Sequence, residues 1–431
     1  MILENIYKNT ERHKLDRYEV LIDTGELPAM GYKTLRVSKT KTSNRNAYFW
    51  PEMRTFNGTE LMTGNHMMEN EYVSVKVNPN GTITICNKET GRVYTDLNYF
   101  EDTGDCGDYW AYYPPYHNKT FNTLGANADI WYEENGPLGA TIAAKIKMDI
   151  PAYVPMCDNV LHSADARSKE LTEIEITTYY TLRKGSKTVD VKTVINNTAK
   201  DHRMRVVFDT GIITDVAKSA GHFYVDERPV VPAEKEYYPE MRTLPKGYFV
   251  KLENENEVFS VIDNCTCEYE ADKDGRLYIT LFRGMRNVIC SEARSPGVFP
   301  HEDGGQSLGE LVFEYKLSVS GDAQTEAEAM SAPIKCIQTS KMGHGTEATS
   351  KSFLEISKPL VMTAFKKCED SDKYMVRFFN PTNQTQNGKI STDMFKDADY
   401  TNLNEQYEGK ADFENIEVSP YKIKTITFDR R

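Results

Sequence analysis

The chain has 431 residues with 27% charged and 39% hydrophobic side chains, which predicts two or three globular domains and excludes a disordered chain. Its net charge of −12 argues against nucleic acid and anionic membrane surfaces as partners, because both are bound through basic patches. No apolar stretch approaches the roughly 18 residues that a membrane span needs.

Two short strands open the chain in our prediction, on either side of a turn at Gly25–Gly31: 17–22 and 32–37. The stretch 38–65 is polar, has few periodic runs, and is interpreted as a link to the main part of the chain. We therefore predict a small leading β-unit with its linker over residues 1–65.

Strands recur from Tyr72 onward. Tyr72–Val77 alternates with period two, and Asn80-Gly81 is a strong hairpin-turn signal. Leu171–Leu182 is the clearest strand, because its β-branched and aromatic residues continue past the usual strand length. Long antiparallel strands in pairs indicate two packed sheets. The predicted strands are 72–77, 82–86, 140–148, 170–183, 187–196, 203–209, 247–253, 257–263, 276–283 and 310–319.

A domain boundary is expected after Met330–Pro333, which follows a short helix predicted at 323–329. Beyond an extended crossing segment, a second pattern of strands begins with 361–365 and 374–379 and ends at Phe428. The predicted fold is all-β: a large antiparallel β-sandwich (a supersandwich) with smaller flanking β-domains. The predicted parts are 1–65, 66–332 and 333–431.

The segment Phe100–Pro115 is the best candidate for a functional loop, because it combines acidic and aromatic side chains with glycines. Carboxylates accept hydrogen bonds from hydroxyl groups, and aromatic faces cover the apolar faces of a sugar. We interpret the loop as a wall of a carbohydrate site. An ordinary turn remains the alternative, since aspartate and glycine are frequent in turns.

Several segments, taken in chain order, resemble the C-terminal β-region of glycoside hydrolase family 38, the zinc-dependent α-mannosidases, in its bacterial branch. The resemblance runs from about Leu21 to the C-terminus. No single segment is specific, but their order is. They are Thr24–Lys33, Asn70–Gly91, Phe100–Pro115, Asn135–Ile142, Asn196–Val206 and Pro420–Phe428.

The resemblance implies that the chain is the C-terminal part of a retaining α-mannosidase. Family members carry an N-terminal β/α barrel that holds zinc and an aspartate nucleophile, and nothing in this chain matches that set. The implied partners are an α-mannoside glycan, the N-terminal catalytic domain of the same enzyme, and further copies of the chain. We expect no cofactor in this chain itself, with zinc in the full-length enzyme. The alternative is a non-catalytic carbohydrate-binding or scaffold module.

The resemblance also implies substrate-binding residues, but no catalytic residue within the chain. Tyr109 is the first candidate, because the family's matching loop contributes a tyrosine to the sugar pocket and a phenol both donates and accepts hydrogen bonds. Asp108 and Asp105 lie beside it in the sequence. The family also uses an arginine from this half of the protein, for which Arg283 and Arg294 are the candidates.

Two other patterns are interpreted as structural. His301-Glu302-Asp303 has the spacing of a metal-binding pair, but it follows Pro300 in a glycine-rich loop with no third ligand nearby, so no metal site is predicted. Asp201-His202 is interpreted as a strand start with solvated charges. The eight cysteines show no pairing pattern, which favours reduced thiols and a cytoplasmic location.

Overall fold

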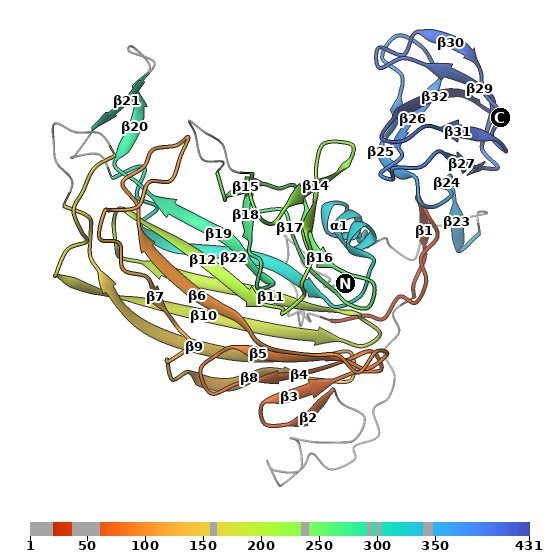
Figure 1. Cartoon of the computed structure of the whole chain (residues 1–431). Coiled ribbons are helices and arrows are strands. Elements are labelled where there is room, and N and C mark those ends of the chain that lie inside the picture. Colours follow the sequence, from red (N-terminus) through yellow and green to blue (C-terminus); the bar gives the residue numbers. More distant parts are fainter. Residues whose placement is uncertain are drawn as a thin grey trace, which may run out of the picture. The chain divides into compact units, whose positions relative to one another are not determined.

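The computed structural model describes residues 20–36, 61–155, 162–233, 241–290, 295–298, 303–338 and 348–431. Within these ranges nearly all regular structure is antiparallel β-strand, which confirms the predicted all-β fold (Figure 1). The described residues form two compact units: one within 48–219 and 227–333, the other from residues up to 47, 220–226 and 334 onward. The three-part division expected from the sequence stays a prediction.

One large sheet has nine strands, in the spatial order β14-β13-β16-β17-β22-β11-β10-β9-β8. Its two longest strands, β9 and β10, pair over 13 residues. The bounds are β8 (Asp129–Asn135), β9 (Gly139–Pro151), β10 (Leu171–Arg183), β11 (Thr188–Asn197), β13 (Val216–Ala220), β14 (Val225–Pro229), β16 (Phe249–Glu253), β17 (Val258–Asp263) and β22 (Gly309–Ser318).

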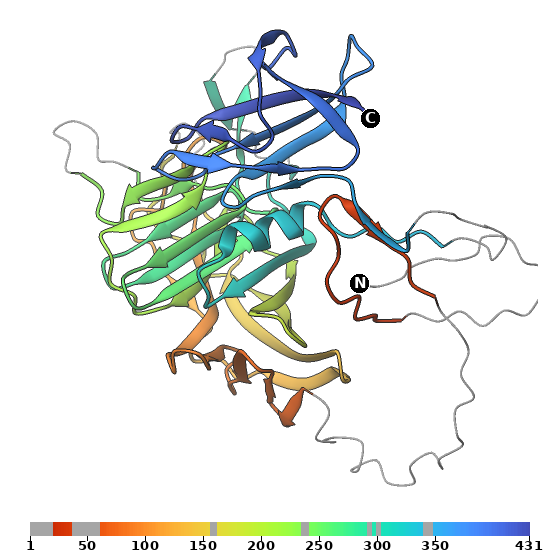
Figure 2. The ribbon, with the colours of Figure 1, turned by 90° about the vertical axis from the view of Figure 1, so that its right-hand side faces the viewer.

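The second large sheet has ten strands, in the order β15-β18-β19-β12-β6-β5-β4-β3-β2, with β7 paired to β6. Its bounds are β2 (Met62–Gly64), β3 (Met67–Glu69), β4 (Val73–Val77), β5 (Ile83–Asn87), β6 (Val93–Gly104), β7 (Phe121–Asn122), β12 (His202–Asp209), β15 (Leu244–Pro245), β18 (Glu268–Ala271) and β19 (Arg276–Gly284). The helix α1 (Ala323–Ser331) packs against β16 and β17 of the other sheet (Figure 1, Figure 2).

The core of this unit follows from the alternation that the sequence shows. From Ile174 to Leu182 every second side chain of β10 is buried, because successive side chains of a strand point to opposite faces. Tyr180 is also fully buried, and its hydroxyl donates to the carbonyl oxygen of Gly81 at 2.7 Å, so the phenol has a partner inside the core. One contiguous cluster of buried apolar side chains joins the two sheets.

The other unit contains a five-stranded sheet in the order β25-β26-β32-β29-β30. Phe395 and Phe428 pack in its separate core with ring centroids 4.6 Å apart. The bounds are β1 (Gly31–Lys33), β23 (Ser350–Ser352), β24 (Glu355–Ile356), β25 (Val361–Lys367), β26 (Tyr374–Phe379), β27 (Gln386–Gly388), β28 (Ile390–Ser391), β29 (Phe395–Thr401), β30 (Tyr407–Lys410), β31 (Ile416–Val418) and β32 (Ile423–Arg430); β1 pairs with β23, β24 with β28 and β27 with β31.

The structure contains strands that the sequence did not predict, including β6, β13, β14 and β18. Residues 100–104 belong to β6, so the loop begins at Asp105 rather than at Phe100. The strand β8 was not predicted, and its exposed aromatic residues interrupt the alternation that would have indicated it. Of the strand expected at 17–22, residues 17–19 lie outside the described residues, and residues 20–22 belong to no named strand. In the part of the chain that the structure describes, no helix is long and apolar enough to cross a membrane.

Candidate functional site

The candidate site lies at one end of the sandwich, where two strands of the second sheet end and the strand between them begins. β6 ends at Gly104, β19 ends at Gly284, and the register pairs both glycines with His202 at the start of β12. The backbone N–H of Asp105 donates to the carbonyl oxygen of Asp201 at 2.9 Å. The chain segments that leave these strands are therefore gathered at one end of the sandwich.

A buried polar cluster lies beneath this end. Asp102 is fully buried on β6 and accepts hydrogen bonds from Arg167 and from Nδ1 of His202, the latter at 2.5 Å. Nε2 of His202 lies 3.0 Å from Oδ1 of Asn197, whose amide nitrogen donates to two backbone carbonyls at 306–307. Both ring nitrogens of His202 thus face oxygen atoms, and the partners fix the ring on both sides.

Asp201 is held in a left-handed backbone conformation, with φ of 53°. Its N–H donates to Oε1 of Gln306, and its Oδ1 accepts from Nε2 of the same amide, both at 2.8 Å. Its other carboxylate oxygen accepts from Nη2 of Arg286 at 3.1 Å. Asp201 and His202 are fully buried, so the expectation of solvated charges was wrong. The sequence did not indicate that Asp201 and His202 are buried with hydrogen-bond partners, because several of those partners are distant in the sequence.

The first turn of the loop is fixed by an ion pair between Asp105 and Arg283. Nε of Arg283 donates to Asp105 at 2.7 Å, and its Nη2 donates to the carbonyl oxygen of Ala111 at 2.8 Å. Asp105 also accepts the N–H of Gly107 at 2.7 Å. A Cβ on Gly107 would lie 2.0 Å from the oxygen of Ala111, so only glycine allows this close approach.

Asp108 orders the next turn. It is nearly fully buried, and its Oδ1 accepts from the N–H groups of Trp110 and Ala111 at 2.8 and 3.0 Å. Its Oδ2 lies 2.8 Å from Nε2 of His162, and the His162 ring stacks on Tyr113 with centroids 4.4 Å apart. Because Asp105 and Asp108 both hold the loop's own backbone, the turn keeps one shape.

On this fixed backbone the loop presents aromatic rings to solvent. Tyr109 is 52% exposed, Trp110 60% and Tyr116 85%, and Tyr113 is exposed as well. An ideal Cβ at Gly305 would lie 3.4 Å from the Tyr109 hydroxyl, which places that hydroxyl beside the 303–306 segment. Rings fixed in place at low entropic cost are suited to stacking on the apolar face of a ligand.

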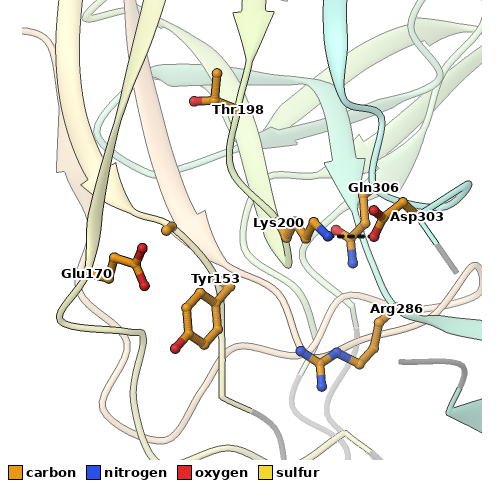
Figure 3. A pocket seen from close by; sticks show the side chains of 8 residues that line it. Tyr153, Glu170, Thr198, Lys200, Arg286, Asp303 and Gln306 are labelled. Carbon is orange, nitrogen blue, oxygen red and sulfur yellow. Dashed lines mark hydrogen bonds and ion pairs between the residues drawn. The ribbon is translucent and has the colours of Figure 1, made fainter. Parts of the chain in front are cut away.

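A hollow of about 360 Å³ lies next to that segment (Figure 3). Lys200 and Asp303 lie on one side of it, joined by an ion pair of 2.6 Å, with Glu170 and Tyr153 on the opposite side. Of the His301/Asp303 pair, for which no metal site was predicted, Asp303 is held by Lys200, and His301 lies outside the described residues. Among the described residues no three His, Cys, Asp or Glu side chains gather as a metal site, so they do not fit the family's zinc.

A second hollow, of about 550 Å³, lies between the loop and strands β6, β12 and β18. The ring of Tyr112 forms part of its wall and lies under the guanidinium group of Arg203, 3.6 Å from ring centroid to Cζ. Burial raises the pKa of the Tyr112 phenol and lowers the pKa of Arg203. Its lining residues are Glu101, Thr103, Tyr112, Pro114, Pro115, Tyr116, Asn118, Thr120, Arg203, Arg205, Met241, Arg242, Thr243 and Glu270.

The structure thus separates the predicted site residues by exposure. Tyr109 faces solvent, whereas Asp105 and Asp108 are buried and bonded within the loop. Arg283 pairs with Asp105, and Arg294 lies outside the described residues. Their roles in binding stay predictions. Sequence reasoning missed the second hollow and Arg203, because the spacing of residues on β12 does not indicate which arginines have a carboxylate nearby in space.

Two packed antiparallel sheets, with aromatic rings and hydrogen-bonding groups at one end, define a β-sandwich protein with a surface suited to a hydroxyl-rich ligand. The chain belongs to glycoside hydrolase family 38. The model "Glycosyl hydrolases family 38 C-terminal domain" matches residues 68–287, and "Glycosyl hydrolases family 38 C-terminal beta sandwich domain" matches 359–426. The resemblance drawn from the sequence is thereby confirmed.

Relatives of this chain are bacterial glycosidases. It is 29% identical over 391 residues to the "Putative mannosylglycerate hydrolase" of Halalkalibacterium halodurans, covering 84% of this chain and 41% of that protein. It is similar in structure to an alpha-mannosidase from Enterococcus faecalis V583, with a TM-score of 0.80 and 27% identity, covering 87% of this chain and 43% of that one. A glycosyl hydrolase family 38 protein from Enterococcus faecalis gives a TM-score of 0.78 at 27% identity, covering 87% and 45%. The chain therefore spans less than half the length of each of these relatives.

Proposed function

We propose that this chain forms the β-sandwich part of a zinc-dependent retaining glycosidase that cleaves terminal α-mannosyl residues. The observation that carries the proposal is the group of exposed rings on a loop fixed by buried carboxylates, in a chain of family 38. In this proposal the loop completes one wall of the sugar site. The catalytic domain that supplies zinc and the nucleophile lies elsewhere in the same enzyme, and we place the enzyme in the cytoplasm.

In this proposal, some residues contact the sugar and others hold the loop in position. Tyr109 contacts the sugar, because its phenol is exposed and can both donate to and accept from a hydroxyl group. Asp105, Asp108 and Arg283 keep the ring in position through their bonds to the loop backbone. Arg294 is proposed as the family's further substrate-binding arginine. Zinc, when bound to the catalytic domain, would supply Lewis-acid chemistry there.

The cytoplasmic location is supported by the thiols. Cys86, Cys106, Cys265, Cys267, Cys336 and Cys368 are all free in the structure. Free thiols persist in the reducing cytosol, whereas secreted proteins of oxidising compartments use theirs in disulfides.

The first test is calorimetric titration of the purified chain with methyl α-D-mannoside. We expect millimolar binding that Tyr109→Ala weakens, because the loop would supply one wall of the site rather than all of it. Tyr132→Ala is the matched control, since Tyr132 on β8 is also 52% exposed but lies outside the loop. Equal binding by wild type and Tyr109→Ala would contradict the proposal.

The second test is hydrolysis of an aryl α-mannoside, with and without added zinc. We expect no turnover by the purified chain in either condition, since the described residues hold no metal site. Zinc-dependent turnover by the chain alone would show that it needs no other domain, and His301 with Asp303 would be the first residues to replace.

A non-catalytic sugar-binding or scaffold module is the second candidate, favoured by the same exposed rings and by the lack of a metal site in the described residues. Immunoprecipitation of the chain from its native cells separates the two. Aryl α-mannosidase activity in the precipitate supports the enzyme assembly. Sugar binding without activity supports the module.

A further inference from the structure

Arg203 is a buried cation with no carboxylate partner among the described residues. Its side chain projects from β12, and only 4% of the residue is exposed. Its Nε has no hydrogen-bond partner, and its Nη1 makes only a long contact of 3.4 Å with Oγ1 of Thr243. Among the described residues no carboxylate forms an ion pair with it. A buried charge normally has such a partner, because desolvation without one is costly.

The two carboxylates that line the hollow, Glu101 and Glu270, already bind another arginine. Arg205, two residues along β12, binds Glu101 through Nε at 3.1 Å and Glu270 through Nη1 at 2.7 Å. With Arg242, the described lining of the second hollow has three guanidinium groups against two carboxylates. Among the described residues, the lining of the hollow therefore carries one more positive than negative charge, on a chain whose net charge is −12.

The pKa of Arg203 is lowered, as expected for a buried cation beside another arginine. Burial lowers it first, and the like charge of Arg205 lowers it further. An anion in the hollow would offset both effects, since an opposite charge nearby favours the charged form of the guanidinium group.

The remaining walls of the hollow suit a sugar ring. Tyr112 holds Arg203 by cation–π stacking, and Tyr116 stands at the wall 85% exposed, so its ring can cover an apolar sugar face. Asn118 and Thr243 bring amide and hydroxyl groups that can bond sugar hydroxyls. At about 550 Å³ the hollow has the size of a small-molecule site.

We propose that the second hollow binds a carboxylate-bearing saccharide, whose carboxylate pairs with the guanidinium group of Arg203. A carboxylate fits better than a phosphate, because Glu101 and Glu270 line the same hollow and repel a doubly charged group more strongly. This site goes beyond the proposed function, because it needs neither hydrolysis nor the Tyr109 wall. Failure of mannoside binding and failure of this site are therefore separate results.

The experiment compares three ligands on the wild-type chain by calorimetric titration at low ionic strength. Methyl β-D-glucuronide carries the carboxylate, methyl β-D-glucoside has the same ring without it, and glucose 6-phosphate carries a phosphate instead. We expect the glucuronide to bind roughly tenfold or more tightly than the glucoside, as for a charge-assisted hydrogen bond, and more tightly than the phosphate. Equal binding of glucuronide and glucoside overturns the proposal, as does preference for the phosphate.

Variants locate the ligand. Arg203→Gln should weaken glucuronide binding roughly tenfold, and Arg203→Lys should weaken it less, because lysine keeps the charge but lacks the planar fork. Lys76→Gln is the control, since it removes a positive charge from an exposed position on β4. Unchanged binding by a folded Arg203→Gln chain overturns the assignment. If that variant does not fold, Tyr116→Ala is the deciding variant, because an exposed ring can be removed without unfolding the chain. Loss of glucuronide affinity in Tyr116→Ala supports the site, and retained affinity overturns it.

Discussion

Replacing Asp105 with asparagine removes one charge from the ion pair that fixes the start of the loop. The Asp105 carboxylate is fully buried, and the change replaces the oxygen that accepts from Nε of Arg283 with an amide nitrogen. Nη2 of Arg283 would keep Oδ1 at 3.2 Å and the carbonyl oxygen of Ala111 as acceptors. Removing one partner of a buried pair costs about 3–5 kcal/mol. Asparagine can still accept the N–H of Gly107, so we expect the lower end, about 3 kcal/mol.

Chemical denaturation monitored by circular dichroism measures this loss as a lower midpoint at an unchanged slope. In a unit of this size each kcal/mol lowers the melting temperature by about 2–4 °C, so the transition should fall by about 6–12 °C. Asp274→Asn is the matched control. Asp274 pairs with Arg276 at 3.5 Å on the surface, where ion pairs contribute about 0–1 kcal/mol.

A double-mutant cycle then tests the cause. If the cost comes from leaving Arg283 buried without its carboxylate, Asp105→Asn combined with Arg283→Met should cost less than the sum of the single variants. Strict additivity, or a loss below about 1 kcal/mol for Asp105→Asn, would refute the reasoning that this pair fixes the loop.

Three further predictions follow from burial. Gly107→Ala should destabilise the chain by about 1–3 kcal/mol in the same denaturation assay, since its Cβ has no space, whereas Gly125→Ala should be neutral because nothing lies within 4 Å of that Cβ. A thiol reagent at pH 8 should label exposed Cys336 but not Cys106, whose thiol is fully buried and whose pKa burial raises to about 12; rapid native-state labelling of Cys106 would contradict this placement. Burial also raises the pKa of Tyr99 to about 12, so Tyr99 and Cys106 stay protonated in the folded chain while they ionise in the unfolded one. The free energy of unfolding should therefore fall as the pH rises from about 9 to 12. A flat profile over this range would show that the two groups are not buried.

The sequence predicted the strands whose pattern is local. The run of β-branched and aromatic residues in 170–183 predicted β10 within one residue at its start, because strand preference depends on the residue types themselves. The same reasoning missed that 100–104 continue β6. Acids such as Asp102 inside a strand contradict the expected pattern unless distant partners neutralise them, and those partners cannot be recognised from local sequence.

What the sequence by itself determined is the all-β class and the family, together with the identity of the loop that carries Tyr109, since each depends on residue order along the chain. Only the tertiary structure decided which charges are paired. Asp105 meets Arg283 across 178 residues of sequence, and Asp102 meets His202 across 100. Within the described part of the chain, the same strand pairing leaves Arg203 without a carboxylate, because β12 places it beside Arg205, which binds Glu101 and Glu270. Electrostatic partnership depends on distance in space, and the pairing of strands far apart in the chain sets that distance.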